Sequence, residues 1–119
     1  MAVYTAIDDS GTFFNPKLYT GTASTLAITG IGFQPDFVWT KSRSNSENNA
    51  LVDSVRGVEK TIRSNTTAAQ TDDPTGLTVF GADGYTIVSD AMFNGSGYTY
   101  ASWNWKAGTT AVPSGGTIT

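Results

Sequence analysis

The stretch that most constrains the fold is residues 98–106, which read Tyr-Thr-Tyr-Ala-Ser-Trp-Asn-Trp-Lys. Aromatic and β-branched residues favour the pleated surface of a strand, and successive side chains of a strand point to opposite faces. One face therefore ends in Trp103 and Trp105, whereas the other carries Tyr98 and Tyr100 and is more polar. We predict a strand whose indole face packs on the core and whose phenol face lies near water, with the other strands gathered around it.

Other short segments alternate in the same way and are separated by polar, glycine-rich turns. Residues 36–42 form a second strong strand, which contains Trp39, and two apolar runs flank the turn at residues 81–84 as in a β-hairpin. The sequence has 13 glycines but only 14% charged residues, a composition typical of turn-rich β proteins. About eight short strands predict an all-β fold, a two-layer antiparallel β-sandwich of the jelly-roll or concanavalin-like kind, with a small barrel as the alternative.

The length of 119 residues suits one domain and is too short for two ordinary ones. We expect an irregular N-terminal arm at residues 1–16, the β-sandwich at residues 17–106, and a Gly/Ser/Thr linker at residues 107–119. Because the last segment has linker composition, we also expect a further domain to follow it.

The sequence contains neither cysteine nor histidine. Disulfides, thiol chemistry and serine–histidine catalysis within this chain are therefore excluded, and so is the commonest metal ligand. The net charge of −3 provides no basic surface for nucleic acid, and no apolar run approaches the ~20 residues that span a bilayer. We expect no cofactor, no metal, and neither nucleic acid nor a membrane as a partner. The first residues also lack the basic and apolar regions of a secretory signal.

Several segments, taken in order, carry a further signal. They include Ile-Thr-Gly-Ile-Gly-Phe-Gln-Pro-Asp-Phe-Val-Trp at residues 28–39 and Asp-Ser-Val-Arg-Gly-Val at residues 53–58. The others are residues 7–9, 14–15, 18–21, 63–69, 83–86 and 98–108. Together they cover nearly all of residues 4–108 and resemble a domain of uncharacterised function found in predicted tail-fibre and other structural proteins of marine bacteriophages, especially those of cyanobacteria.

The resemblance implies a non-enzymatic virion structural protein, a domain of a tail fibre or similar appendage that serves assembly, attachment and host recognition. It implies a place on the phage particle after synthesis in the host cytoplasm, contacts with other virion proteins, and a homotrimer, because fibres are commonly trimers. No catalytic residue can be carried over, since the family's function is unassigned. The alternative is a lectin-like, carbohydrate-binding module that reads host surface glycans. A polysaccharide-degrading enzyme is a third interpretation.

Two sets of aromatic residues are candidates for ligand contact. Tyr98, Tyr100 and Asn104 share one strand face and combine aromatic bodies with polar tips, so we predict that they contact a glycan; a subunit interface or a solvated face is the simpler interpretation. The indoles of Trp39, Trp103 and Trp105 are alternative candidates for stacking on sugars. We assign these indoles to the structural core, because each lies in an alternating strand.

The charged candidates are weaker. Asp53, Arg56 and Arg63 are candidates for recognising an anionic ligand, but an Asp–Arg pair more often ties a turn, so we predict a structural salt bridge between Asp53 and Arg56. The acidic pairs at residues 8–9 and 72–73 lack the spacing of a known calcium loop, so neither is assigned a metal. Two carboxyl groups facing each other across a cleft, drawn from Glu47, Glu59 and the aspartates, would be needed for glycoside hydrolysis.

Overall fold

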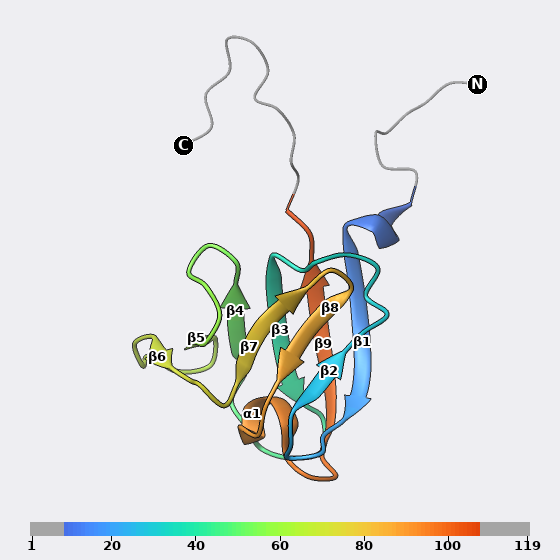
Figure 1. Cartoon of the computed structure of the whole chain (residues 1–119). Coiled ribbons are helices and arrows are strands. Elements are labelled where there is room, and N and C mark those ends of the chain that lie inside the picture. Colours follow the sequence, from blue (N-terminus) through green and yellow to red (C-terminus); the bar gives the residue numbers. More distant parts are fainter. Residues whose placement is uncertain (1–8, 108–119) are drawn as a thin grey trace, which may run out of the picture.

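Two antiparallel sheets that face each other make up the computed structural model, which describes residues 9–107 (Figure 1). The large sheet has the strand order β1-β9-β3-β4-β5-β6 and the small sheet the order β2-β8-β7. The strands of the large sheet are β1 (Phe14–Thr20), β9 (Thr99–Trp105), β3 (Phe37–Ser42), β4 (Ala50–Asp53), β5 (Lys60–Arg63) and β6 (Thr71–Asp72). The strands of the small sheet are β2 (Leu26–Ile28), β8 (Gly84–Ile87) and β7 (Leu77–Gly81). The predicted all-β, two-layer antiparallel sandwich is confirmed.

Two short helical segments complete the described chain. The 3-10 helix η1 (Ser10–Thr12) precedes β1, and α1 (Ala91–Asn94) lies between β8 and β9 at one end of the sandwich. The first strand begins at Phe14, so the segment expected to be an irregular arm contributes its last three residues to the large sheet. The rest of that arm, residues 1–8, and the expected linker from residue 108 onward lie outside the described residues. No helix in the described part of the chain has the length and apolar character that a membrane crossing requires.

The strand β9 lies inside the large sheet, between β1 and β3, as the sequence pattern predicts. The hairpin between β7 and β8 also forms where it is predicted, with Gly81 opposite Gly84. Gly84 has a φ of +157°, and a Cβ there would collide with the carbonyl oxygen of Ile28. This position therefore needs glycine, because the close approach lets β8 pair with β2.

The interior between the sheets is formed by the face of β9 that was expected to face water. Tyr100, Ser102 and Asn104 are all fully buried, whereas Trp103 and Trp105 are only half-buried on the opposite face. The prediction that the indoles fill the core is therefore wrong, and so is the prediction that the phenol of Tyr100 faces water. The core itself is aliphatic and aromatic, and its members are Ile28, Ile31, Phe33, Val38, Ala50, Val52, Leu77, Tyr85, Ile87, Met92 and Phe93.

Hydrogen bonds explain why this polar face of β9 can be buried. The hydroxyl of Tyr100 donates to the carbonyl oxygen of Ala91 at 2.6 Å and accepts from the backbone N–H of Gly95 at 2.6 Å. The amide Nδ2 of Asn104 donates to the carbonyl oxygen of Asn15 on β1 at 2.9 Å. A buried polar group costs little once it is hydrogen-bonded, which explains how the phenol of Tyr100 and the Nδ2 of Asn104 lie between the sheets; Oδ1 of Asn104 has no partner in the described structure.

Asn94, the last residue of α1, connects the segments at the end of the sandwich where α1 lies. Its side chain is fully buried; Oδ1 accepts from the backbone N–H of Thr22 at 2.7 Å, and Nδ2 donates to the carbonyl oxygens of Ser24 and Val88. These three bonds join the helix to the loop between β1 and β2 and to the end of β8. One amide therefore bonds three backbone groups on two separate segments.

We predict that Asn94→Ala lowers the free energy of unfolding by about 3 kcal/mol, because it removes three hydrogen bonds made by a fully buried amide and leaves a space in the interior. Urea unfolding followed by circular dichroism measures the change. Asn45→Ala, on an exposed loop, is the matched control and should change stability by less than about 0.5 kcal/mol. Equal effects of the two substitutions would contradict this role of Asn94.

Candidate functional site

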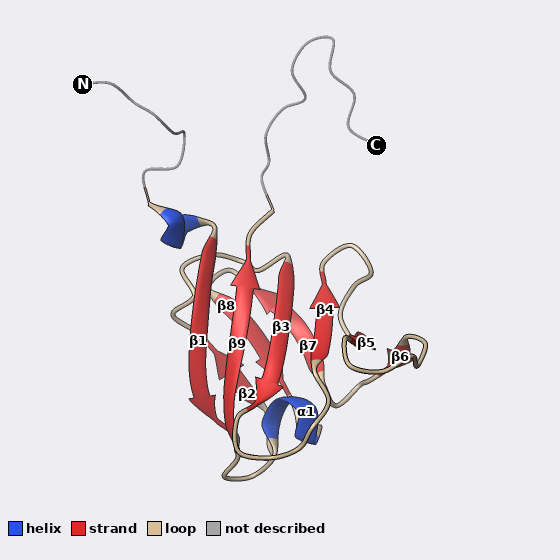
Figure 2. Ribbon diagram, turned by 180° about the vertical axis from the view of Figure 1, so that it is seen from behind, coloured by secondary structure: helices blue, strands red, loops and turns tan. Residues whose placement is uncertain are grey.

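The outer face of the large sheet carries a cluster of aromatic side chains, which we call the aromatic face: Phe14, Phe37, Trp39, Trp103 and Trp105. The strand register sets their arrangement, because Trp105 is paired with Phe14 on one side and Phe37 on the other. Two residues along the strands, Trp103 is paired with Trp39. The cluster therefore spans about 10 Å across three strands and about 7 Å along them. In Figure 2 no helix or strand of the described chain lies over this side of β1, β9 and β3.

The rings of the aromatic face contact one another without lying flat. The centroid of the Trp105 ring is 5.0 Å from those of Phe14 and Phe37, with interplanar angles of 44° and 41°. The rings of Trp39 and Trp103 meet edge to face, at 6.1 Å and 67°. Such tilted and edge-to-face pairs are favoured geometries for aromatic rings, so the contacts between the rings stabilise their arrangement in the cluster.

The tilt of the rings creates an open hollow of about 200 Å³ that is lined by Trp39, Trp103 and Trp105, which we call the indole hollow. These are the three tryptophans of the chain. All three side chains are half-buried, which leaves part of each indole in contact with solvent. The residues that sequence analysis assigned to the core thus line a hollow on the outer face of the large sheet.

Polar and apolar groups border the aromatic face on opposite sides. On the edge strand β1, Leu18 is 61% exposed and lies next to Ala101 in the register. On β3, Lys41 follows Trp39 on the same face, and its ammonium group donates to the carbonyl oxygens of Glu47 at 2.7 Å and Asn45 at 3.4 Å. An ammonium group has three N–H donors, so Lys41 keeps one for another acceptor.

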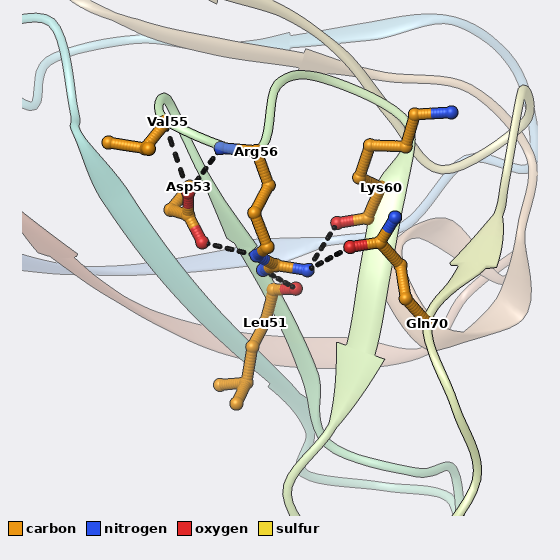
Figure 3. Close-up of polar contacts among 6 residues, drawn as sticks. All are labelled: Leu51, Asp53, Val55, Arg56, Lys60 and Gln70. Carbon is orange, nitrogen blue, oxygen red and sulfur yellow. Dashed lines mark hydrogen bonds and ion pairs between the residues drawn. The ribbon is translucent and has the colours of Figure 1, made fainter.

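The predicted ion pair between Asp53 and Arg56 is present beside this face, with 2.6 Å between Oδ2 and Nε (Figure 3). Asp53 lies opposite Phe37 in the register of β3 and β4. Burial alone would raise the pKa of Asp53, but the backbone N–H and the guanidinium of Arg56 outweigh it and lower that pKa below its ordinary value. The carboxylate therefore stays ionised at neutral pH.

The guanidinium of Arg56 also donates to three further oxygens, on separate segments. Figure 3 shows these bonds at the turn between β4 and β5. The acceptors are the carbonyl oxygens of Leu51 and Lys60 and the side-chain oxygen of Gln70, at 3.1, 3.2 and 3.2 Å. Arg63, the other candidate for an anionic ligand, lies opposite Ala50 at the far end of β4 and does not join this group. The arrangement is that of a structural tie rather than an anion site.

The tyrosines that we predicted as glycan contacts do not form a surface site. Tyr98 is half-buried against Gly95, and the rings of Tyr100 and Tyr19 stack inside the sandwich with centroids 5.1 Å apart. Burial raises the pKa of Tyr100 and Tyr19, and it raises the pKa of Tyr85 to about 12. These phenols therefore keep their protons at neutral pH.

The acidic residues are dispersed over separate turns. Asp9 caps η1, and Asp72 forms an ion pair with Lys60; Asp8 lies outside the described residues. Glu47 and Glu59 lie at opposite ends of β4, so they do not face each other across a cleft. Within residues 9–107 no group of three or more acidic side chains is placed to hold a metal ion.

Among residues 9–107, Asp73 is the acidic residue whose side chain is buried. Its side chain is only 7% exposed; Oδ1 accepts from the N–H and hydroxyl of Thr75, and Oδ2 has no partner. Burial, followed by repulsion from the neighbouring Asp90, raises the pKa of Asp73. A raised pKa in the folded state means that folding is favoured when this group holds its proton and is opposed as the pH rises through that pKa.

We therefore predict that Asp73→Asn raises the melting temperature at pH 7 by a few degrees, because it removes a buried charge and supplies an N–H donor toward Asp90. The gain should shrink as the pH falls and Asp73 of the original chain becomes protonated. Thermal unfolding between pH 3 and pH 8 measures it. Asp72→Asn, at an exposed neighbour, is the control and should give no gain. A gain that is independent of pH would contradict the electrostatic cause.

Comparison with known proteins adds a family but no function. A family model described as a domain of unknown function, DUF7483, matches residues 9–119. No curated protein and no solved structure matches the chain. The matched segment includes both sheets and the aromatic face, so the function has to be argued from the geometry of the site.

Proposed function

We propose that this chain, which belongs to the DUF7483 family of domains of unknown function, is a non-enzymatic attachment domain of a bacteriophage appendage such as a tail fibre. The observation that carries the proposal is the uncovered aromatic face of the large sheet. A sheet face that packs on nothing normally carries polar side chains, whereas this one carries three indoles and two phenyl rings. Exposed apolar patches of this kind mark binding surfaces.

The chemistry of the face supports binding rather than catalysis. Its rings neither donate nor accept protons in the way that acid–base catalysis requires. The charged groups at its border, Lys41 and Asp53, are engaged with backbone carbonyls and with Arg56. The resemblance to tail-fibre proteins of marine phages supports the setting, namely the surface of the virion, with other virion proteins as neighbours.

Assembly between copies of the chain is the second candidate role of this face. The apolar surface continues to the edge of the sheet, where Leu18 is 61% and Phe13 37% exposed. A neighbouring subunit that covered them would join the edge strand β1 to the aromatic face. A homotrimer, the state common in fibres, would then be held by this surface, and light scattering would give three times the monomer mass of 12.5 kDa.

We predict that the double substitution Trp39→Ala/Trp103→Ala reduces attachment to host cells about tenfold or more, because aromatic anchors dominate interface energies. The full chain, fused to a fluorescent protein, is incubated with a panel of marine cyanobacteria and related bacteria, and bound fluorescence is measured by flow cytometry. Circular dichroism checks that the variant is folded.

Val79→Ser is the matched control, since Val79 is 49% exposed and belongs to the small sheet. It should leave attachment unchanged. A folded double variant that attaches as well as the original chain would rule out the aromatic face as the attachment surface.

A further inference from the structure

We infer that the indole hollow binds one neutral pyranose unit of a surface glycan. The inference rests on the proposed attachment function and names the ligand class for it. The occupant follows from three properties of the hollow: its size, its lining and the charge around it.

The size of the hollow fits one six-membered ring. Its volume of about 200 Å³ corresponds to about seven water molecules at ~30 Å³ each. That room admits a single sugar ring with its substituents directed outward. Because the hollow opens toward solvent on an uncovered sheet face, the neighbouring units of a longer glycan can continue over the surface.

The lining suits the apolar face of a sugar. A pyranose ring presents several C–H groups on one side and its hydroxyls around the perimeter, so one side stacks on an aromatic ring while the rim stays hydrated. Trp39 and Trp103 meet at 67°, which provides one indole as a floor and another as a wall, and Trp105 completes the lining. Sites of this kind combine an apolar lining with a few polar groups that fix the orientation of the ligand.

The polar group placed to orient the sugar is the ammonium of Lys41. It follows Trp39 on the same face of β3, and the carbonyl oxygens of Glu47 and Asn45 hold it by two hydrogen bonds. Its third N–H donor is directed neither to a backbone group nor to a carboxylate in the described structure, so it can serve a sugar hydroxyl. Lys41 therefore acts as a positioning residue at the border of the hollow.

An acidic sugar needs a cation that is free to pair with it, and Lys41, the cation at the border of the hollow, is already held by two backbone carbonyl oxygens. The carboxylate of Asp53 is neutralised by Arg56, so the guanidinium is not free to receive an acidic group. The sequence as a whole carries a net charge of −3, which repels acidic polysaccharides and nucleic acids. A neutral hexose or N-acetylhexosamine meets neither obstacle.

Intrinsic fluorescence tests this inference directly, because all three tryptophans of the chain line the hollow and every indole signal therefore originates there. The full chain is titrated with glucose, galactose, mannose and N-acetylglucosamine, free and as short oligosaccharides. N-Acetylneuraminic acid is the anionic probe. We expect a saturable change in indole emission with at least one neutral sugar and none with the anionic probe.

Variants are compared by binding to the same sugars immobilised on a surface. Trp103→Ala should weaken binding about tenfold or more, and Lys41→Met should weaken it several-fold while Lys41→Arg restores it. Val79→Ser should bind as the original chain does. This pattern separates sugar contact from a general loss of structure, because Lys41→Met leaves all three indoles in place.

Three results would overturn the inference. One is the absence of any saturable response to neutral sugars; if the indole double variant still fails to attach to cells, the attachment function stands and its ligand is not a neutral sugar. Another is a response to the anionic sugar alone. The third is indole emission that depends on protein concentration, together with a mass by light scattering above that of the monomer, which would identify a second copy as the occupant.

Discussion

The rest of the structure depends on which face of β9 is buried between the two sheets. On its inner side, the hydroxyl of Tyr100 is held by Ala91 and Gly95 at the two ends of α1, and the amide of Asn104 is held by Asn15 on β1. These bonds join β9 to segments at both ends of the sandwich. Once they form, the alternation of the strand directs Trp103 and Trp105 outward.

The neighbouring strands reinforce this choice of faces. On β3, Val38 and Thr40 are fully buried, so Phe37 and Trp39 lie on the same outer side as the indoles of β9. The antiparallel register then places aromatic residues opposite one another on adjacent strands, where cross-strand pairs stabilise a sheet. The aromatic face is thus a consequence of register and of the polar anchors inside, and its half-exposed rings are what the domain offers to a ligand.

The sequence pattern is sufficient for the layer architecture, the position of β9, the β7–β8 hairpin and the ion pair between Asp53 and Arg56. These features depend on local alternation, on glycine at a tight turn and on residues three positions apart. Which face of each strand packs against the second sheet cannot be predicted in this way. Alternation defines two faces but does not say which one is buried, and the usual preference for indoles inside and phenols outside points the wrong way here.

The partners that reverse this preference are distant in sequence. Asn15 is 89 residues from Asn104, and no local pattern reveals that its carbonyl oxygen meets the Asn104 amide. The sequence pattern therefore places the candidate site on Tyr98, Tyr100 and Asn104 and assigns the three tryptophans, the alternative candidates for stacking on sugars, to the core. The alternation in β3 is the sequence feature that indicates the correct orientation. Val38 and Thr40 lie on one face of this strand and Phe37 and Trp39 on the other, and small side chains fit between two sheets more easily than indoles do.

Collisional quenching of tryptophan fluorescence by acrylamide tests the orientation of β9 most directly. The account predicts that the folded chain is quenched with a constant that is a large fraction of the value for the urea-unfolded chain, as a single accessible population. Indoles that resist the quencher until the chain unfolds would show that Trp39, Trp103 and Trp105 are interior, and would contradict the account.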